Sequence, residues 1–169
     1  MPKNGNNIYL VNPGQHDHFF GNLTPRGVDE SVHAGAVIAG KETKLVVISA
    51  TDERTSETAD LVADQCDTKA IKTELVDAIS DHIERIGGDL EQYVGRVLHS
   101  EGVAVDEDTA VVMVTHASVL AAAKGYDQMA LATGAVTSGE VVVFDAEQWH
   151  ERAGFAGQSA LRQSELVAV

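Results

Sequence analysis

The sequence predicts an α/β fold, a three-layer α/β/α sandwich around a mostly parallel sheet. Short apolar runs alternate along the chain with segments of helical periodicity, which is the pattern of α/β proteins. Residues 45–48 (LVVI) and 110–114 (AVVMV) are apolar throughout, as in strands that are covered on both faces. Thr24-Pro25 places an N-cap residue before a proline at the first helical position, which is a helix-start signal.

The remaining elements follow in order from these anchors. Strands are expected at residues 8–11, 45–48, 70–75 and 110–114, with a closing pair of edge strands at 136–138 and 140–144 around Gly139. Helices are expected from 24 to about 40, 53 to 66, 83 to 101 (with Gly87-Gly88 as a point of division) and 119 to 124. The stretch from the weak strand at 70–75 to Ser80 is expected to be irregular.

The apolar positions of three helices predict which face each one buries. The first helix is expected to turn Val28, Val32, Ala36 and Ala39 inward. The second is expected to bury Ala59, Val62 and Ala63, and the third Leu90, Val94, Val97 and Leu98.

Length and charge restrict the kinds of protein this chain can be. The 169 residues predict a single domain, with a core at about 7–145 and a C-terminal segment, 146–169, that is either a packed helix or a tail. The net charge of −14 argues against nucleic acid or an anionic membrane as partners. No apolar run approaches the roughly 18 residues that span a bilayer, and the polar start does not resemble a secretory signal. A cytoplasmic location is therefore expected.

Polar residues stand just beyond the C-terminal ends of the predicted strands. Asn12-Pro13-Gly14-Gln15 follows the first strand, and Thr115-His116 follows the strand at 110–114. Ligands of open α/β sheets bind at this edge, and helix N-termini there offer free N–H groups to an anion. The sequence thus predicts an anion site at the carboxyl edge of the sheet.

Four segments, in order, resemble the histidine phosphatase (phosphoglycerate mutase-like) superfamily. They are the first strand with Gly14-Gln15 after it, residues 23–27 (LTPRG), residues 49–59 (SATDERTSETA) and residues 114–119 (VTHASV). The resemblance covers residues 8 to about 145 and implies the superfamily's fold.

The resemblance also implies residue functions. In the superfamily, two His and two Arg hold a phosphoryl group, one His attacks the phosphorus, and a carboxylic acid protonates the leaving oxygen. Arg54 matches the second Arg and His116 the second His. The acid would be either Glu74 or Asp77, which follow the weak third strand.

The first strand departs from the superfamily's Arg-His-Gly. Asn12 stands in place of the Arg, and Pro13 in place of the nucleophilic His. A proline in the chain has no lone pair for attack and no N–H to donate. Each lost charge-assisted hydrogen bond is worth about 1.5–3 kcal/mol, so two lost contacts weaken phosphate affinity by roughly two to four powers of ten.

We therefore expect a pseudophosphatase that keeps half of a phosphate pocket and binds a small phosphorylated ligand or a protein. The residues expected to line that pocket are Asn12, Gly14, Gln15, His16, Arg54 and His116. The main alternative is an active phosphomonoesterase or phosphohistidine phosphatase with His16 as a displaced nucleophile. A third is a scaffold whose pocket has no function.

A metal site is a further hypothesis from the sequence. His16 and His18 could converge with His116 and either Asp17 or Asp52, a ligand set suited to zinc. Because an H-x-H pair alone is usually two solvated loop histidines, we expect no metal and no cofactor.

Overall fold

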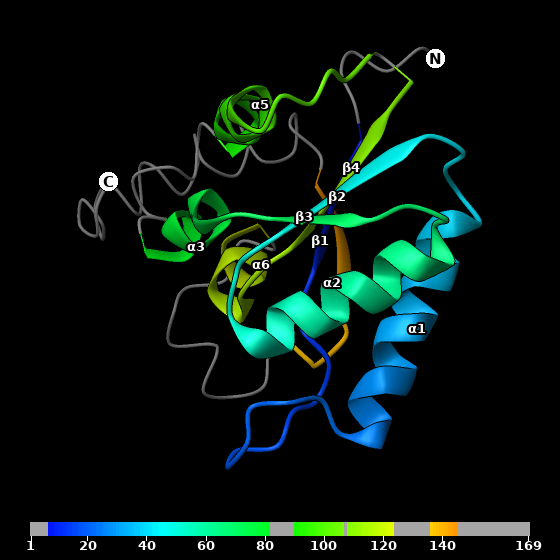
Figure 1. Cartoon of the computed structure of the whole chain (residues 1–169), viewed down its shortest axis with the longest axis vertical. Coiled ribbons are helices and arrows are strands. Elements are labelled where there is room, and N and C mark those ends of the chain that lie inside the picture. The colour runs from blue at the N-terminus through cyan, green and yellow to red at the C-terminus, as the bar shows by residue number, and fades with distance from the viewer. Residues whose placement is uncertain (1–6, 82–89, 107, 124–135, 145–169) are drawn as a thin grey trace.

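The computed structural model describes residues 7–81, 90–106, 108–123 and 136–144 (Figure 1). Its strands are β1 (Ile8–Val11), β2 (Leu45–Ser49), β3 (Ala70–Lys72), β4 (Ala110–Val114) and β5 (Val141–Phe144). Its helices are α1 (Pro25–Ala39), α2 (Glu53–Gln65), α3 (Glu74–Asp81), α5 (Leu90–Ser100) and α6 (Ala117–Ala123). None of these helices is long and apolar enough to cross a bilayer.

The five strands form one sheet in the order β3-β2-β4-β1-β5. The first four are parallel, and Val112 in the central β4 lies beside Tyr9 of β1 on one side and Val47 of β2 on the other. β5 runs antiparallel to β1, with Val142 beside Leu10. The prediction of a mostly parallel sheet is confirmed.

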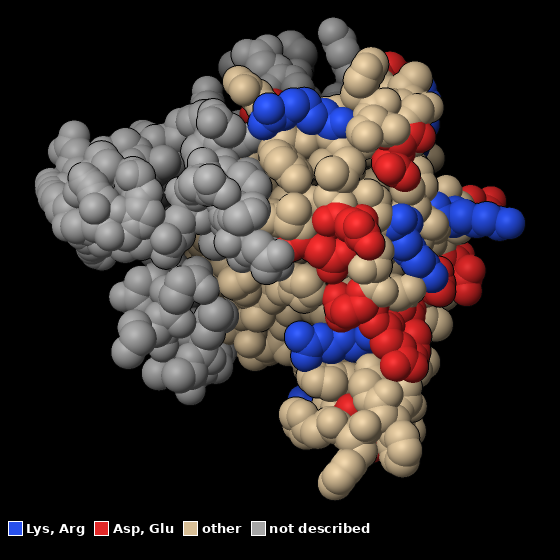
Figure 2. All heavy atoms as spheres, turned by 60° about the vertical axis from the view of Figure 1, so that its left-hand side comes forward, with Lys and Arg blue, Asp and Glu red and all other residues tan. Residues whose placement is uncertain are grey.

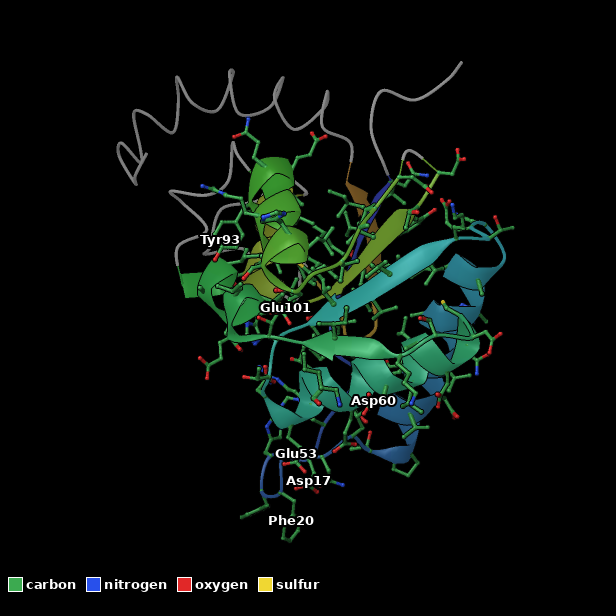
Figure 3. All side chains as sticks on the ribbon, turned by 45° about the horizontal axis from the view of Figure 1, so that its top comes forward. Asp17, Phe20, Glu53, Asp60, Tyr93 and Glu101 are labelled. Atoms are coloured by element: carbon green, nitrogen blue, oxygen red, sulfur yellow. The ribbon has the colours of Figure 1, made fainter. Side chains whose placement is uncertain are left out.

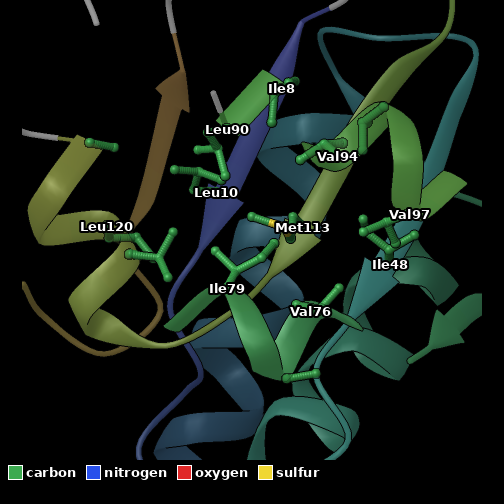
Figure 4. Close-up of a cluster of buried hydrophobic side chains, with 14 of the residues drawn as sticks. Ile8, Leu10, Ile48, Val76, Ile79, Leu90, Val94, Val97, Met113 and Leu120 are labelled. Atoms are coloured by element: carbon green, nitrogen blue, oxygen red, sulfur yellow. The ribbon is translucent and has the colours of Figure 1, made fainter. Parts of the chain in front are cut away.

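Helices cover both faces of the sheet, which confirms the three-layer architecture. In Figure 1, α1 and α2 lie on one side, and α3, α5 and α6 on the other. Alternate strand residues separate the two cores: Val11, Val47 and Val112 pack toward α1 and α2. Leu10 and Met113 belong to the other core, whose buried side chains are drawn in Figure 4. The continuous apolar runs arise because each strand is buried on both faces.

The predicted inward faces of α2 and α5 are confirmed, but that of α1 is wrong. The residues predicted to be inward are exposed or half-buried: Val28, Val32, Ala36 and Ala39. The buried ones are Gly27, Ser31, Ala34, Gly35 and Ile38. The α1 helix approaches α2 through small residues, and a Cβ on Gly35 would lie 2.9 Å from the Cα of Val62. Apolar periodicity misses this face because three of its five buried residues are glycine or serine.

The segment after β3 is helical, not irregular. Strand β3 ends at Lys72, short of the predicted Leu75. Thr73 then starts α3, because its Oγ1 accepts a hydrogen bond from Leu75 N and its carbonyl one from Val76 N. Thr73 before Glu74 is therefore an N-cap signal for α3 that the sequence analysis did not use. Helix α6 begins at Ala117, two residues before the predicted start.

Of the two edge strands predicted around Gly139, only the second is confirmed: β5 covers 141–144 of the predicted 140–144 and lies at the edge of the sheet. Residues 136–140 are not a strand, and β5 pairs with β1 instead. Glu140 N donates to the carbonyl of Thr137, and Gly139 has φ +72°. This is a β-turn with glycine at its left-handed position. Residues 82–89, 107, 124–135 and 145–169 lie outside the described residues, including the Gly87-Gly88 division and the C-terminal segment.

Candidate functional site

A pocket of about 260 Å³ lies at the carboxyl edge of the sheet, where the sequence predicted it. Pro13 is buried, directly after β1, and Arg54 is in the first turn of α2. The lining residues are Asn12, Pro13, Gly14, Gln15, His16, His18, Arg54, Ala117 and Ser138. Five of the six residues predicted to bind a ligand thus line one cavity, and the sixth, His116, lines a neighbouring one.

The turn after β1 is held by hydrogen bonds that use its own polar groups. Gly14 N donates to Thr58 Oγ1 at 3.1 Å, and Gln15 N donates to Glu30 Oε1 at 2.9 Å. The side-chain amide of Asn12 donates to the carbonyl of Thr137 at 2.8 Å. These N–H groups are therefore already paired, and an anion would have to displace their acceptors to use them.

His16 and Arg54 form the basic part of the pocket. Arg54 Nη1 lies 3.0 Å from Nε2 of His16. Because a guanidinium can only donate, this nitrogen of His16 accepts and carries no proton. Burial lowers the pKa of His16 below its ordinary value, and electrostatic interactions with Arg54 and His18 lower it further. At neutral pH the imidazole of His16 is uncharged.

His116 pairs with the carboxylate of Asp52 rather than standing alone at the pocket. The distance between His116 Nε2 and Asp52 Oδ1 is 2.8 Å. Asp52 is also the N-cap of α2, and its Oδ2 accepts from Thr55 N and Thr55 Oγ1. Burial raises the pKa of Asp52, but the hydrogen bonds from His116 and Thr55 outweigh it and leave the pKa well below its ordinary range. Asp52 Oδ2 is also 3.6 Å from Arg54 Nε, so it partly neutralises the pocket's guanidinium.

The structure separates the two candidate acids. Asp77 accepts hydrogen bonds from Thr51 N at 3.1 Å and Thr51 Oγ1 at 2.7 Å, beside Asp52 and His116. Neither acid is among the residues that line the two pockets at this edge, and Glu74 is exposed. Asp77 is therefore the candidate acid placed near the site.

A second, more open pocket of about 420 Å³ adjoins the first. Its lining residues are His16, Asp17, His18, Gly21, Asp52, Glu53, Arg54 and His116. On the face drawn in Figure 2, acidic side chains gather in the middle of the described surface, with a few basic side chains beside them. Among the residues that line the two pockets, Arg54 is the only lysine or arginine, and the chain as a whole is strongly acidic.

Sequence reasoning missed a pair of exposed aromatic side chains on the loop beside this pocket. Phe19 and Phe20 are 94% and 78% exposed. Asp17 Oδ1 accepts from the backbone N–H groups of both, which fixes the turn that presents them. Figure 3 shows Phe20 at the tip of the loop, beyond Asp17 and Glu53.

Comparison with known proteins shows which solved structures share this architecture. No protein-family model and no curated protein sequence matches the chain. A mycobacterial glucosyl-3-phosphoglycerate phosphatase has a similar structure, with a TM-score of 0.54 and 17% identity over 82% of this chain and 89% of that one. The chain has the phosphoglycerate mutase-like fold.

Two further structures share the phosphoglycerate mutase-like fold. Phosphoserine phosphatase from Entamoeba histolytica gives a TM-score of 0.55 at 11% identity, covering 82% of this chain and 89% of that one. A variant of it, with one histidine replaced by alanine, forms a complex with phosphoserine. A proposed alpha-ribazole-5′-phosphate phosphatase from Escherichia coli has a TM-score of 0.53 and 17% sequence identity, over 83% of this chain and 91% of that one. The structural neighbours are phosphatases of the histidine phosphatase fold, which confirms the resemblance at the level of the fold.

Proposed function

We propose that this chain is a catalytically degenerate histidine-phosphatase-like protein, which binds a phosphorylated small molecule or a phosphorylated segment of a protein at Arg54. The observation that carries the proposal is Pro13. It lines the pocket beside Arg54 and His16, at the position where the resemblance puts the nucleophile. A prolyl nitrogen is an amide without a lone pair for attack, so no phosphoenzyme forms at this residue.

The groups around Arg54 are consistent with binding rather than turnover. A guanidinium presents two donors to two phosphate oxygens. His16 gains a positive charge once it takes up a proton, and it lies within hydrogen-bonding distance of Arg54. The complex between phosphoserine and the His-to-Ala variant of the Entamoeba protein supports the same idea, since this fold there holds a phosphorylated ligand with one histidine removed.

Arg54→Ala is expected to weaken sulfate and phosphoserine binding by about 10- to 100-fold, because one charge-assisted hydrogen bond is worth roughly 1.5–3 kcal/mol. Its melting temperature should change little, since the half-exposed pair with Asp52 contributes weakly to stability. Isothermal titration calorimetry measures the affinity. Arg96→Ala removes the same charge from the exposed face of α5 and serves as the matched control. Equal affinities in Arg54→Ala and wild type would place the ligand elsewhere.

Anion binding is expected to strengthen as the pH falls from about 8 to 5. In the free protein His16 is neutral, because burial, Arg54 and His18 lower its pKa, against a smaller raising effect of Asp52 and Asp17. An anion beside it raises that pKa, so the bound form takes up a proton and the affinity increases below neutral pH, by about tenfold. Sulfate is the probe, because it stays doubly charged over this range.

The control for this pH dependence is His16→Ala. The variant should bind sulfate with an affinity that changes little over the same range. If it keeps the wild-type pH profile, another group titrates and His16 is not part of the anion site.

The second candidate function is phosphomonoester or phosphohistidine hydrolysis with His16 as the nucleophile. The placement of His16 in the same cavity as Arg54 favours it. The Nε2 atom would attack phosphorus as the bond to the leaving oxygen, or to the leaving imidazole nitrogen of a phosphohistidine, breaks. A protonated Asp77 would give its proton to the leaving atom, and water would then hydrolyse the phosphoryl group from His16. Against it stands the hydrogen bond from Arg54, which occupies the lone pair that must attack. An acid-labile phosphoryl group on His16 after rapid quenching, absent in His16→Ala, would establish this function.

A further inference from the structure

We propose that Asp52, Asp77 and His116 form a binding site for a divalent transition metal ion of the Zn²⁺ class. The site is separate from the proposed anion site in the residues that carry it, and it departs from the expectation of no metal drawn from the sequence. The three side chains follow β2, β3 and β4, and these strands are neighbours in the sheet order. Parallel strands bring their carboxyl ends together at one edge.

The spacing of the ligand atoms fits one ion. One ring nitrogen of His116 and one carboxylate oxygen from each aspartate lie within 4.8 Å of one another. In a tetrahedral zinc site, bonds of about 2.0–2.2 Å place the ligand atoms roughly 3.3 Å apart. Small side-chain rotations are enough to reach that separation. The Asp52 oxygen and the His116 nitrogen already face each other across 2.8 Å, so the metal would take the place of the proton between them.

Neighbouring threonines orient both carboxylates. Thr55 donates from its N and Oγ1 to Oδ2 of Asp52, which leaves Oδ1 directed at His116. Thr51 donates from its N and Oγ1 to Asp77. Carboxylates that bind a metal are commonly hydrogen-bonded in this way, and the outer-shell donors, here the two threonines, fix the ligand geometry.

The ligand chemistry and the access select the class of metal. Two carboxylate oxygens with one imidazole nitrogen suit Zn²⁺ and Co²⁺, whereas Ca²⁺ and Mg²⁺ prefer oxygen ligands alone. The three residues are half-buried, and Asp52 and His116 line the open pocket of about 420 Å³. An ion can therefore enter from solvent and complete its coordination with water.

A set of ligands containing His16 and His18 is not favoured by the geometry. Among the described residues, the group whose ligand atoms lie within 4.8 Å contains Asp77 in place of both loop histidines. The rings of His16 and His18 are 5.1 Å apart and meet edge to face. Asp77, one of the two residues that the sequence offered as the proton donor, is therefore the residue that distinguishes the two sets.

The test is a titration of chelator-treated, phosphate-free protein with Co²⁺, followed by its visible d–d bands, and then displacement by Zn²⁺. Wild type should give a saturable 1:1 complex. Asp77→Asn and His116→Gln should each weaken Co²⁺ binding by about 100-fold or more, since even outer-shell changes cost roughly 10–100-fold. Glu74→Gln, three residues before Asp77 on the same helix and exposed, is the matched control and should bind like wild type.

Further variants distinguish the metal site from the anion site and from a metal site built on the loop histidines. Arg54→Ala should retain Co²⁺ binding and weaken sulfate binding. Asp77→Asn should weaken Co²⁺ binding and retain sulfate binding. The metal proposal and the anion proposal can therefore fail independently. Either of two results would overturn the metal proposal. One is the absence of a saturable Co²⁺ spectrum in wild type. The other is a spectrum that survives in folded Asp77→Asn but disappears in His18→Ala.

Discussion

Asn12→Arg combined with Pro13→His is expected to create phosphomonoesterase activity, at least about 100-fold above the wild-type rate. The change supplies a nucleophile and a guanidinium at the end of β1, where both side chains would face the cavity that already holds Arg54. Catalytic groups that act as a unit are strongly non-additive, so one missing nucleophile abolishes most of the rate enhancement, by roughly 10⁶-fold in one well-studied case. Hydrolysis of p-nitrophenyl phosphate measures the gain.

The single variants control this prediction. Asn12→Arg alone should remain inactive, since it still lacks a nucleophile. Pro13→His alone should show a smaller activity, because it lacks the second guanidinium. The cavity of about 260 Å³ has space for the larger side chains, although Asn12 must give up its hydrogen bond to Thr137. A folded double mutant without activity would mean that the rest of the pocket no longer supports the chemistry.

Gly27→Ala is expected to destabilise the protein by about 3 kcal/mol, which lowers the melting temperature by roughly 6–12 °C in a domain of this size. A Cβ on Gly27 would lie 2.0 Å from the carbonyl oxygen of Gln15, which is backbone and accepts a hydrogen bond from Thr24 N. The loop after β1 must then move off α1. Thermal unfolding followed by circular dichroism measures the shift.

Gly95→Ala is the matched control, because it makes the same change in a helix without a clash. Nothing lies within 4 Å of the Cβ that it adds to α5. Helix propensity then dominates, and the variant should be more stable by about 0.5–1 kcal/mol. Similar melting temperatures for the two variants would refute the close contact between the β1 loop and α1. Gly27→Ala should also reduce sulfate affinity, because the displaced loop carries His16.

Strands β1, β2 and β4 and their parallel arrangement were readable from the sequence, because a strand buried on both faces is apolar along its length. The features that the sequence did not predict depend on contacts between residues that are distant in the sequence. Three of the five buried residues of α1 are Gly27, Ser31 and Gly35, and their shared property is small size rather than apolarity. Strand β5 pairs with β1, 130 residues away in sequence, so no local pattern around Gly139 could assign its partner.

The functional site was likewise predicted only in part from the sequence. Arg54, His16 and Pro13 could be placed in one pocket from the resemblance, since each stands just after a strand or at a helix start. The sequence brought His116 and Asp52 together only within a possible metal set that included the loop histidines, and it did not predict the hydrogen bond between them. Only Asp52's function as the N-cap of α2 has a local signal, an aspartate immediately before the helix. The choice of Asp77 over Glu74 likewise depended on which face of α3 meets Thr51.

We propose that this chain has lost the catalytic chemistry of its fold through Pro13. The most direct measurement is the hydrolysis of a broad phosphomonoester panel by wild type, His16→Ala and His116→Ala, purified identically. The account predicts no turnover above the buffer rate for any of the three proteins. Wild-type turnover that disappears in His16→Ala would contradict it, and would make this protein an active phosphatase with a displaced nucleophile.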